Sequence, residues 1–184
     1  FGPHTKYYPY VAQAQANGPP LVTADDDMLY PRDWLAALVH AYAANPHLIH
    51  CWRARVLQLA SQGLQPYASW AYCRSGKASP WHIAEGVSGV IYPAAFQMQL
   101  RAAGTAFKAC CPRADDLWLN VQALRAGMPV QQISANAHNF PCIPGTELQG
   151  LMHGNVVGLG NDAQAAASYT EADLAPLRLT PYIA

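Results

Sequence analysis

The feature that most constrains the fold is the segment Leu21–Asp27, in which a short apolar run ends on three consecutive aspartates. The run to Ala24 is typical of a buried strand, so we expect the carboxylates at the strand's carboxyl end. Three adjacent like charges repel unless a divalent cation, hydrogen-bond donors or a raised pKa offsets the repulsion. Ligands of open α/β sheets bind outside the carboxyl ends of the strands. The segment therefore predicts a ligand site, although a solvated acidic turn is the simpler interpretation.

The composition favours one folded domain and excludes several classes of partner. The chain has 184 residues and 52% hydrophobic content, enough for a substantial core. Its 11 basic and 11 acidic residues balance, which argues against a nucleic-acid or anionic membrane surface. No apolar run approaches the roughly 20 residues of a membrane span. Five cysteines without metal-ligand spacing argue against a disulfide framework and favour a reducing compartment.

Alternating helix and strand patterns predict an α/β fold. A helix is expected to begin near Tyr30-Pro31 and to end at Asn45-Pro46, because its apolar residues share one helical face. The other expected elements are a strand over 48–54, an irregular stretch over 61–80, a glycine turn over 86–89, strands over 90–92 and 130–133, and a last helix after Asn161-Asp162.

A second acidic pair, Asp115-Asp116, precedes an apolar helical period that ends at Gly127. One aspartate at a helix start commonly serves as a cap and interacts with the helix dipole, worth about 1 kcal/mol. Two adjacent aspartates exceed that need. The pair therefore predicts a second part of the ligand site at a helix N-terminus.

The ordered set of motifs resembles the GT-A glycosyltransferases, and especially bacterial family-2-like enzymes of polysaccharide assembly. The resemblance implies a GT-A-like mixed sheet flanked by helices, with residues 1–184 forming a single glycosyltransferase-like domain. Because that family begins with a strand-helix-strand unit, the resemblance also implies that the chain is N-terminally incomplete. The motifs that carry it are Gly2-Pro3 with Lys6, Asp25-Asp26-Asp27, Tyr30-Pro31, the glycine turn over 86–89, Asp115-Asp116 and Asn161-Asp162.

The same resemblance implies roles for individual residues. Asp116 would be the general base, with Asp115 as its support. The donor nucleotide would be bound by Lys6, Asp25 and Asp26, and Mn²⁺ or Mg²⁺ by Asp27 and Asp25. The weaker candidates are His153 as a further metal ligand, and Trp81, Gly89 and Trp118 as contacts to the acceptor or sugar.

The implied activity is metal-dependent transfer of a sugar from a nucleotide-diphosphate sugar to a glycan or other hydroxyl acceptor. It would serve bacterial surface polysaccharide or glycoconjugate synthesis, in the cytoplasm or at the inner membrane face. Two alternatives stay open. In a haloacid-dehalogenase-like phosphatase Asp25 would be the nucleophile and Asp27 the acid/base, but no lysine motif lies between the two acidic sites. In the other alternative, the chain is a sugar- or nucleotide-binding module without catalysis.

Overall fold

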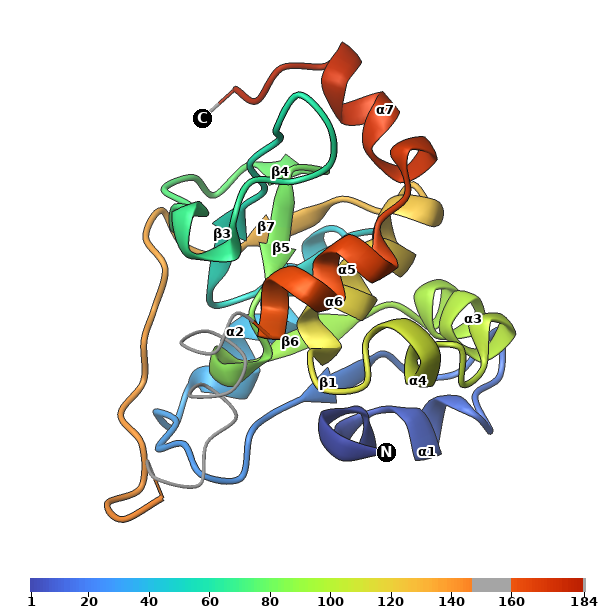
Figure 1. Cartoon of the computed structure of the whole chain (residues 1–184). Helices are drawn as coiled ribbons and strands as arrows, with labels where there is room; N and C mark the ends of the chain where they lie inside the picture. Colours follow the sequence, from blue (N-terminus) through green and yellow to red (C-terminus); the bar gives the residue numbers. More distant parts are fainter. Residues whose placement is uncertain (147–159, 184) are drawn as a thin grey trace.

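Short runs of β-branched and other apolar residues form a mixed sheet (Figure 1). The computed structural model describes residues 1–146 and 160–183. Its larger sheet has five strands, and a second sheet has two. In spatial order the strands of the larger sheet are β1 (Leu21–Thr23), β6 (Val90–Tyr92), β2 (Ile49–Cys51), β7 (Val130–Gln132) and β4 (Ala78–Ser79); the smaller sheet pairs β3 (Ala54–Val56) with β5 (His82–Ala84).

The larger sheet contains both kinds of strand pairing. β6 runs antiparallel to both β1 and β2, β2 runs parallel to β7, and β4 pairs antiparallel with β7. Every residue of β2 and β6 is buried, as expected for central strands covered on both faces. The structure therefore confirms a mixed α/β fold with helices flanking the sheet.

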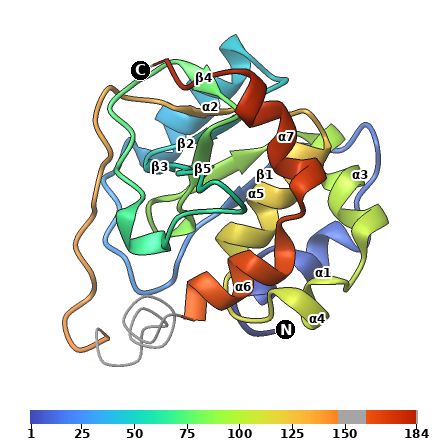
Figure 2. The same cartoon turned by 45° about the horizontal axis from the view of Figure 1, so that its top comes forward.

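Helices cover the sheet and fill the N- and C-terminal parts of the chain. Figures 1 and 2 show α3, α5 and α6 gathered on one side of the sheet. No helix in the described part of the chain is both long and apolar enough to cross a bilayer. The helical segments are η1 (Gly2–Lys6), α1 (Tyr8–Val11), α2 (Trp34–Ala44), η2 (Tyr67–Ser69), η3 (Gly86–Ser88), α3 (Ala94–Ala103), α4 (Phe107–Cys110), α5 (Asp115–Arg125), α6 (Gly160–Ser168) and α7 (Glu171–Leu179).

The helix α5 is buried almost all round, which fixes the aspartates at its first turn. It packs against β5 and against α3, α6 and α7, so apolar residues are needed on more than one face. Its buried side chains include Leu117, Trp118, Leu119, Val121 and Ala123.

The start of the chain is anchored by a buried histidine. His4 Nε2 lies 2.7 Å from the carbonyl oxygen of Cys111, and Nδ1 lies 2.9 Å from the Tyr7 hydroxyl. The imidazole also stacks on Phe107, with ring centroids 3.9 Å apart. Burial lowers the pKa of His4, which keeps the ring neutral at pH 7. These contacts hold η1, and with it Lys6, against the segment that leads into α5.

Several predicted elements differ from the structure. The buried pattern of the strand before the three aspartates predicts a central strand, but this strand, β1, lies at an edge of the larger sheet. The expected strand over 48–54 is interrupted after Cys51, because the chain leaves the larger sheet and re-pairs in the smaller one at Ala54. Helix α2 begins at Trp34, after a turn over 31–33, and α6 already begins at Gly160. The strand β5 and the helices α3, α4 and α7 were not predicted.

Candidate active site

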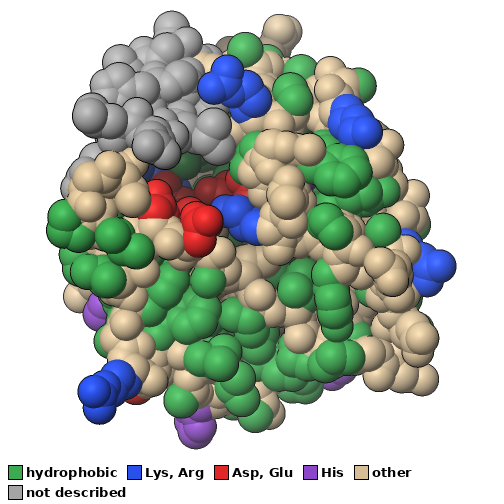
Figure 3. All heavy atoms as spheres, turned by 90° about the horizontal axis from the view of Figure 1, so that it is seen from below, with side chains coloured by type: hydrophobic (Ala, Val, Ile, Leu, Met, Phe, Trp, Pro, Cys, Tyr) green, Lys and Arg blue, Asp and Glu red, His purple; other side chains and the backbone are tan. Residues whose placement is uncertain are grey.

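A lysine joins the two acidic segments that the sequence singled out. The Lys6 Nζ donates to Asp25 Oδ1 at 2.6 Å and lies 3.2 Å from Asp115 Oδ2. Asp115 Oδ2 is buried and accepts no hydrogen bond from the residues that the structure describes, and the Lys6 cation compensates its charge. Figure 3 shows acidic side chains gathered in a hollow on one face, with a basic side chain beside them. Lys6, Asp25 and Asp115 thus form one site.

The glycine turn supplies a donor to the second aspartate of the pair. The backbone N–H of Gly86 donates to Asp116 Oδ1 at 2.9 Å. A Cβ atom at position 86 would lie 3.0 Å from that same oxygen and 3.3 Å from Lys6 Nζ. Glycine at this position therefore lets the backbone approach both charged groups.

Two aromatic side chains fix the acidic turn to the glycine turn. The Tyr30 hydroxyl accepts from the backbone N–H of Asp25 at 2.9 Å and donates to the carbonyl oxygen of Val87 at 3.0 Å. Trp34 Nε1 donates to the carbonyl oxygen of Ser88 at 2.8 Å. The Tyr-Pro segment after the aspartates thus has a definite structural role, which is to position the two turns.

The electrostatics of the site favour a proton on one carboxyl group and a fully charged lysine. Burial and the neighbouring Asp115 hold the pKa of Asp116 well above its usual range, although Lys6 and the Gly86 N–H oppose the shift. Burial would lower the pKa of Lys6, but Asp115, Asp116 and Asp25 outweigh it, so the pKa is raised. A carboxyl group with a raised pKa beside an ion pair has the features of a general acid or base.

The acidic turn carries oxygen ligands of the kind that a hard divalent cation prefers. Asp26 is exposed and Asp27 is half-buried, and neither side chain forms an ion pair within the described residues. Among those residues no three His, Cys, Asp or Glu side chains are grouped to hold a metal. Mg²⁺ is usually held by one or two carboxylates, with substrate phosphates and water completing its shell. Asp27, with Asp25, can supply that part of the shell.

Three of the weaker candidates have structural roles, and the fourth falls outside the described residues. Trp118 is buried in the core, so its face cannot stack on a sugar. Trp81 precedes the strand β5, at the opposite end from Gly86, and its Nε1 donates to the Thr180 carbonyl oxygen at 2.8 Å. Gly89 has φ +97°, and a Cβ atom there would lie 2.2 Å from the Trp34 ring, which explains the glycine without a ligand. His153 lies outside the described residues.

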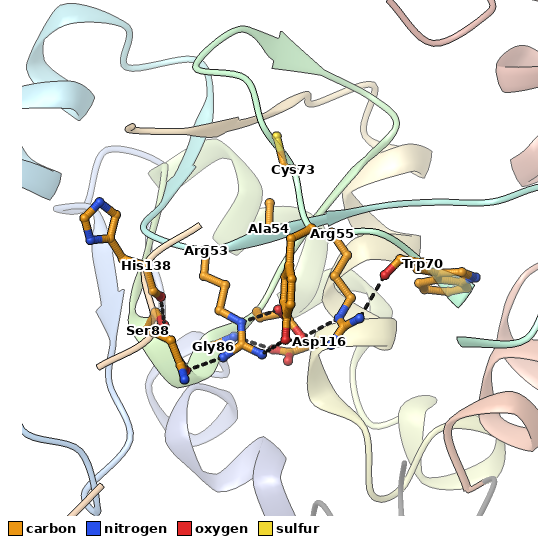
Figure 4. Close-up of polar contacts among 12 residues, drawn as sticks. Arg53, Ala54, Arg55, Trp70, Cys73, Gly86, Ser88, Asp116 and His138 are labelled. Carbon is orange, nitrogen blue, oxygen red and sulfur yellow. Dashed lines mark hydrogen bonds and ion pairs between the residues drawn. The ribbon is translucent and has the colours of Figure 1, made fainter. Parts of the chain in front are cut away.

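A second charged cluster borders the site and was not predicted. Glu85, the residue before Gly86, is buried and forms ion pairs with Arg53 and Arg55 (Figure 4). It also accepts from the Tyr67 hydroxyl at 3.1 Å. Arg53 and Arg55 alternate with Ala54, a spacing typical of one strand face, and that pattern is the signal that could have identified them.

The chain matches no family model, no curated protein and no solved structure in the comparisons made.

Proposed function

We propose that this chain is a metal-dependent glycosyltransferase that moves a sugar from a nucleotide-diphosphate donor to a hydroxyl acceptor. The observation that carries the proposal is the contact of Lys6 with both Asp25 and Asp115. A transferase needs donor-binding and acceptor-activating groups within one site, and this contact brings the two acidic segments together. The resemblance of the motifs further supports a role in bacterial polysaccharide or glycoconjugate synthesis.

In this proposal Asp116 removes the proton of the acceptor hydroxyl. Its raised pKa makes the ionised form of Asp116 a stronger base than an ordinary carboxylate, and this form is reached once the carboxyl group has lost the proton that burial favours. The Gly86 N–H holds Oδ1, which leaves Oδ2 to accept the proton. Asp115 forms an ion pair with Lys6 and so keeps the lysine beside the base.

The acidic turn has the complementary task of holding the donor. Asp27 and Asp25 would hold Mn²⁺ or Mg²⁺, and the bound ion would act as a Lewis acid on the diphosphate leaving group. Asp26, which is exposed, is free to contact the donor nucleotide. Lys6 adds a positive charge close to the donor phosphates.

The test is donor turnover by the chain of residues 1–184 with Mn²⁺ and a panel of nucleotide-diphosphate sugars, measured as release of the nucleoside diphosphate. Asp27→Asn should weaken metal-dependent donor binding in calorimetry, because a neutral amide is a poor ligand for a hard cation. With a reactive acceptor, Asp116→Asn should lower turnover by about 10² to 10⁴ while donor affinity stays nearly unchanged.

The matched control is Asp33→Asn, the same change at an exposed residue before α2. Asp33→Asn should alter neither metal-dependent donor binding nor turnover. Full transfer activity in Asp116→Asn would remove Asp116 from the role of base and would favour a retaining mechanism.

One contact favours phosphate-ester hydrolysis as the second candidate. Lys6 Nζ lies 2.6 Å from Asp25, and a cation at that position could stabilise an aspartyl-phosphate intermediate. Hydrolysis of p-nitrophenyl phosphate with Mg²⁺, lost in Asp25→Asn, together with a covalent phosphoenzyme in mass spectrometry, would decide for this candidate and against transfer.

A further inference from the structure

Two arginines share one buried glutamate at the border of the site. Arg53 Nε lies 2.5 Å from Glu85 Oε2, and Arg55 Nε lies 2.9 Å from Oε1. The backbone N–H of Glu85 also donates to the Arg53 carbonyl oxygen at 3.0 Å. This cluster, Arg53–Glu85–Arg55, is therefore fixed by both side-chain and main-chain bonds.

The two guanidinium groups lie on the same side of the strand. Ala54 and Val56 point into the core, so the alternation of a strand places Arg53 and Arg55 on the opposite face. Figure 4 shows both arginines extending toward the region of Gly86 and Asp116, with Ala54 on the other side. Because Glu85 and Gly86 are consecutive, one peptide unit joins the cluster to the N–H that binds Asp116.

Neutral acceptors hold the guanidinium groups in place without reducing their charge. The Tyr72 hydroxyl accepts from Arg53 Nη2 at 2.8 Å and from Arg55 Nη2 at 3.1 Å. Asn139 Oδ1 accepts from Arg53 Nη1 at 2.6 Å, and the Trp70 carbonyl oxygen from Arg55 Nη1 at 2.8 Å. A guanidinium carries five N–H donors, and the contacts within residues 1–146 and 160–183 use three of them in each arginine, which leaves two without a partner among those residues.

Within the cluster two cations face one carboxylate in a poorly hydrated position, and the neighbouring Asp116 has a raised pKa, which favours its neutral form. Two guanidinium ions face one carboxylate, and the side chains of Arg53 and Arg55 are only 13% and 15% exposed. A single arginine would be enough to neutralise Glu85. Partial burial of a second cation costs free energy unless an anion compensates it. Arginine pairs are well suited to this task, because their planar forks match the oxygens of phosphate and carboxylate groups.

We propose that the Arg53–Glu85–Arg55 cluster binds an oxyanion, a phosphate or carboxylate, carried by the acceptor, and so directs the acceptor hydroxyl toward Asp116. The assignment of this anion to the acceptor substrate rests on the proposed function, whereas the oxyanion site itself does not. The acceptor would then be an acidic or phosphorylated glycan or lipid-linked glycan and not a neutral one.

The site is tested first without metal or turnover, so that the acidic turn cannot bind the anion through a cation. The complete chain is titrated with inorganic phosphate and, separately, with acetate, and binding is followed by calorimetry and tryptophan fluorescence. Arg53→Gln and Arg55→Gln should each weaken binding by about ten-fold or more, the effect of losing a charge-assisted hydrogen bond. Arg178→Gln is the matched control, because Arg178 Nε also binds a glutamate, Glu171, but on α7.

Glu85→Gln separates an anion site from a purely structural cluster. Removing the carboxylate leaves two uncompensated cations, so anion binding should become tighter even if the fold loses stability. Far-UV circular dichroism checks the fold, and Arg53→Lys, which keeps the charge, serves if Arg53→Gln does not fold. Saturable binding that is weaker in the arginine variants and tighter in Glu85→Gln supports the site. The anion that binds more tightly, phosphate or acetate, shows whether the ligand carries a phosphate or a carboxylate.

No saturable binding of either anion, or binding that the arginine variants leave unchanged, would overturn the proposal. Turnover distinguishes the source of the anion: Arg53→Gln should raise the KM of the acceptor and leave donor affinity unchanged. A fall in donor affinity would assign the cluster to the donor phosphates and refute the acceptor assignment. If anion binding follows the pattern but no donor is turned over, the glycosyltransferase proposal fails while the oxyanion site stands.

Discussion

Replacing Asp116 by asparagine should make the protein more stable at neutral pH. In the folded state this carboxyl group is half-buried next to Asp115, and its pKa lies well above the usual range because burial and that neighbour disfavour its ionised form. Asparagine keeps the Oδ1 acceptor for the Gly86 N–H but carries no charge. Lys6 keeps two carboxylate partners, Asp25 and Asp115. We expect a gain on the order of 1 kcal/mol or more, because each unit by which the pKa differs between the folded and unfolded states corresponds to about 1.4 kcal/mol.

The sign of the pH dependence follows from the direction of the shift. Because the folded protein holds the Asp116 proton more tightly than the unfolded chain, the stability contributed by Asp116 is complete below its unfolded pKa near 3.9. It is lost as the pH rises through the folded pKa. The two proteins should therefore unfold at similar urea concentrations at pH 3.5, and Asp116→Asn at a higher concentration at pH 8.

Urea unfolding at both pH values measures the difference, with Asp33→Asn as the exposed control. A variant that is less stable than the wild type at pH 8, or whose difference is the same at both pH values, would refute the reasoning. A confirmed gain would also mean that the chain keeps a destabilising carboxylate where the proposed chemistry needs one.

Three further predictions concern Lys6 and the glycine turn. Lys6→Met should cost about 2–4 kcal/mol in urea unfolding at pH 7, because it leaves the buried Asp115 carboxylate without its cation; a loss below about 0.5 kcal/mol would show that water compensates that charge. Gly86→Ala should reduce turnover or donor affinity by a larger factor than it reduces the equilibrium constant of folding, since the new methyl group would lie 3.0 Å from an Asp116 oxygen. An equal factor in the activity measurement and in urea unfolding would contradict this. Gly89→Ala should cost at least about 2 kcal/mol, from a positive φ and a clash with an indole. Gly104→Ala, with φ +59° and open space, should cost only the conformational part, so equal losses would remove the clash from the explanation.

The charged motifs of the site were predictable because adjacent like charges repel one another unless a ligand or a charged partner offsets the repulsion. Asp25 follows a short strand, Asp115 begins a helix, and Gly86 opens the turn before β6, as the sequence indicated. The contact between Lys6 and both acidic segments was expected only in part, from the motif at the chain's start. The roles of Asp27 in metal binding and of Asp116 as the base remain predictions.

The rest of the site and fold depends on tertiary packing that local sequence does not encode. Arg53 and Glu85 lie directly outside β3 and β5, and the pairing of these two strands places them together, which the spacing of Arg53 and Arg55 alone does not indicate. Trp118 has the same sequence neighbourhood whether it faces a ligand or the core, and in the structure its ring is buried with its centroid 6.1 Å from that of Phe107. The edge position of β1 likewise follows from strand order, which the local pattern leaves open.

The anchoring of the chain's start also has a consequence for the order of folding. His4 and Cys111 are separated by 107 residues, and their contact is what holds Lys6 near the carboxylates of α5. Closing so long a loop is entropically costly, so contacts of this range form slowly and after local structure. The acidic turn and the first turn of α5 can each form early, but their carboxylates repel one another until Lys6 forms its ion pairs with Asp25 and Asp115. Ligand-binding competence should consequently appear only in the last kinetic phase of refolding, later than the recovery of helical circular dichroism.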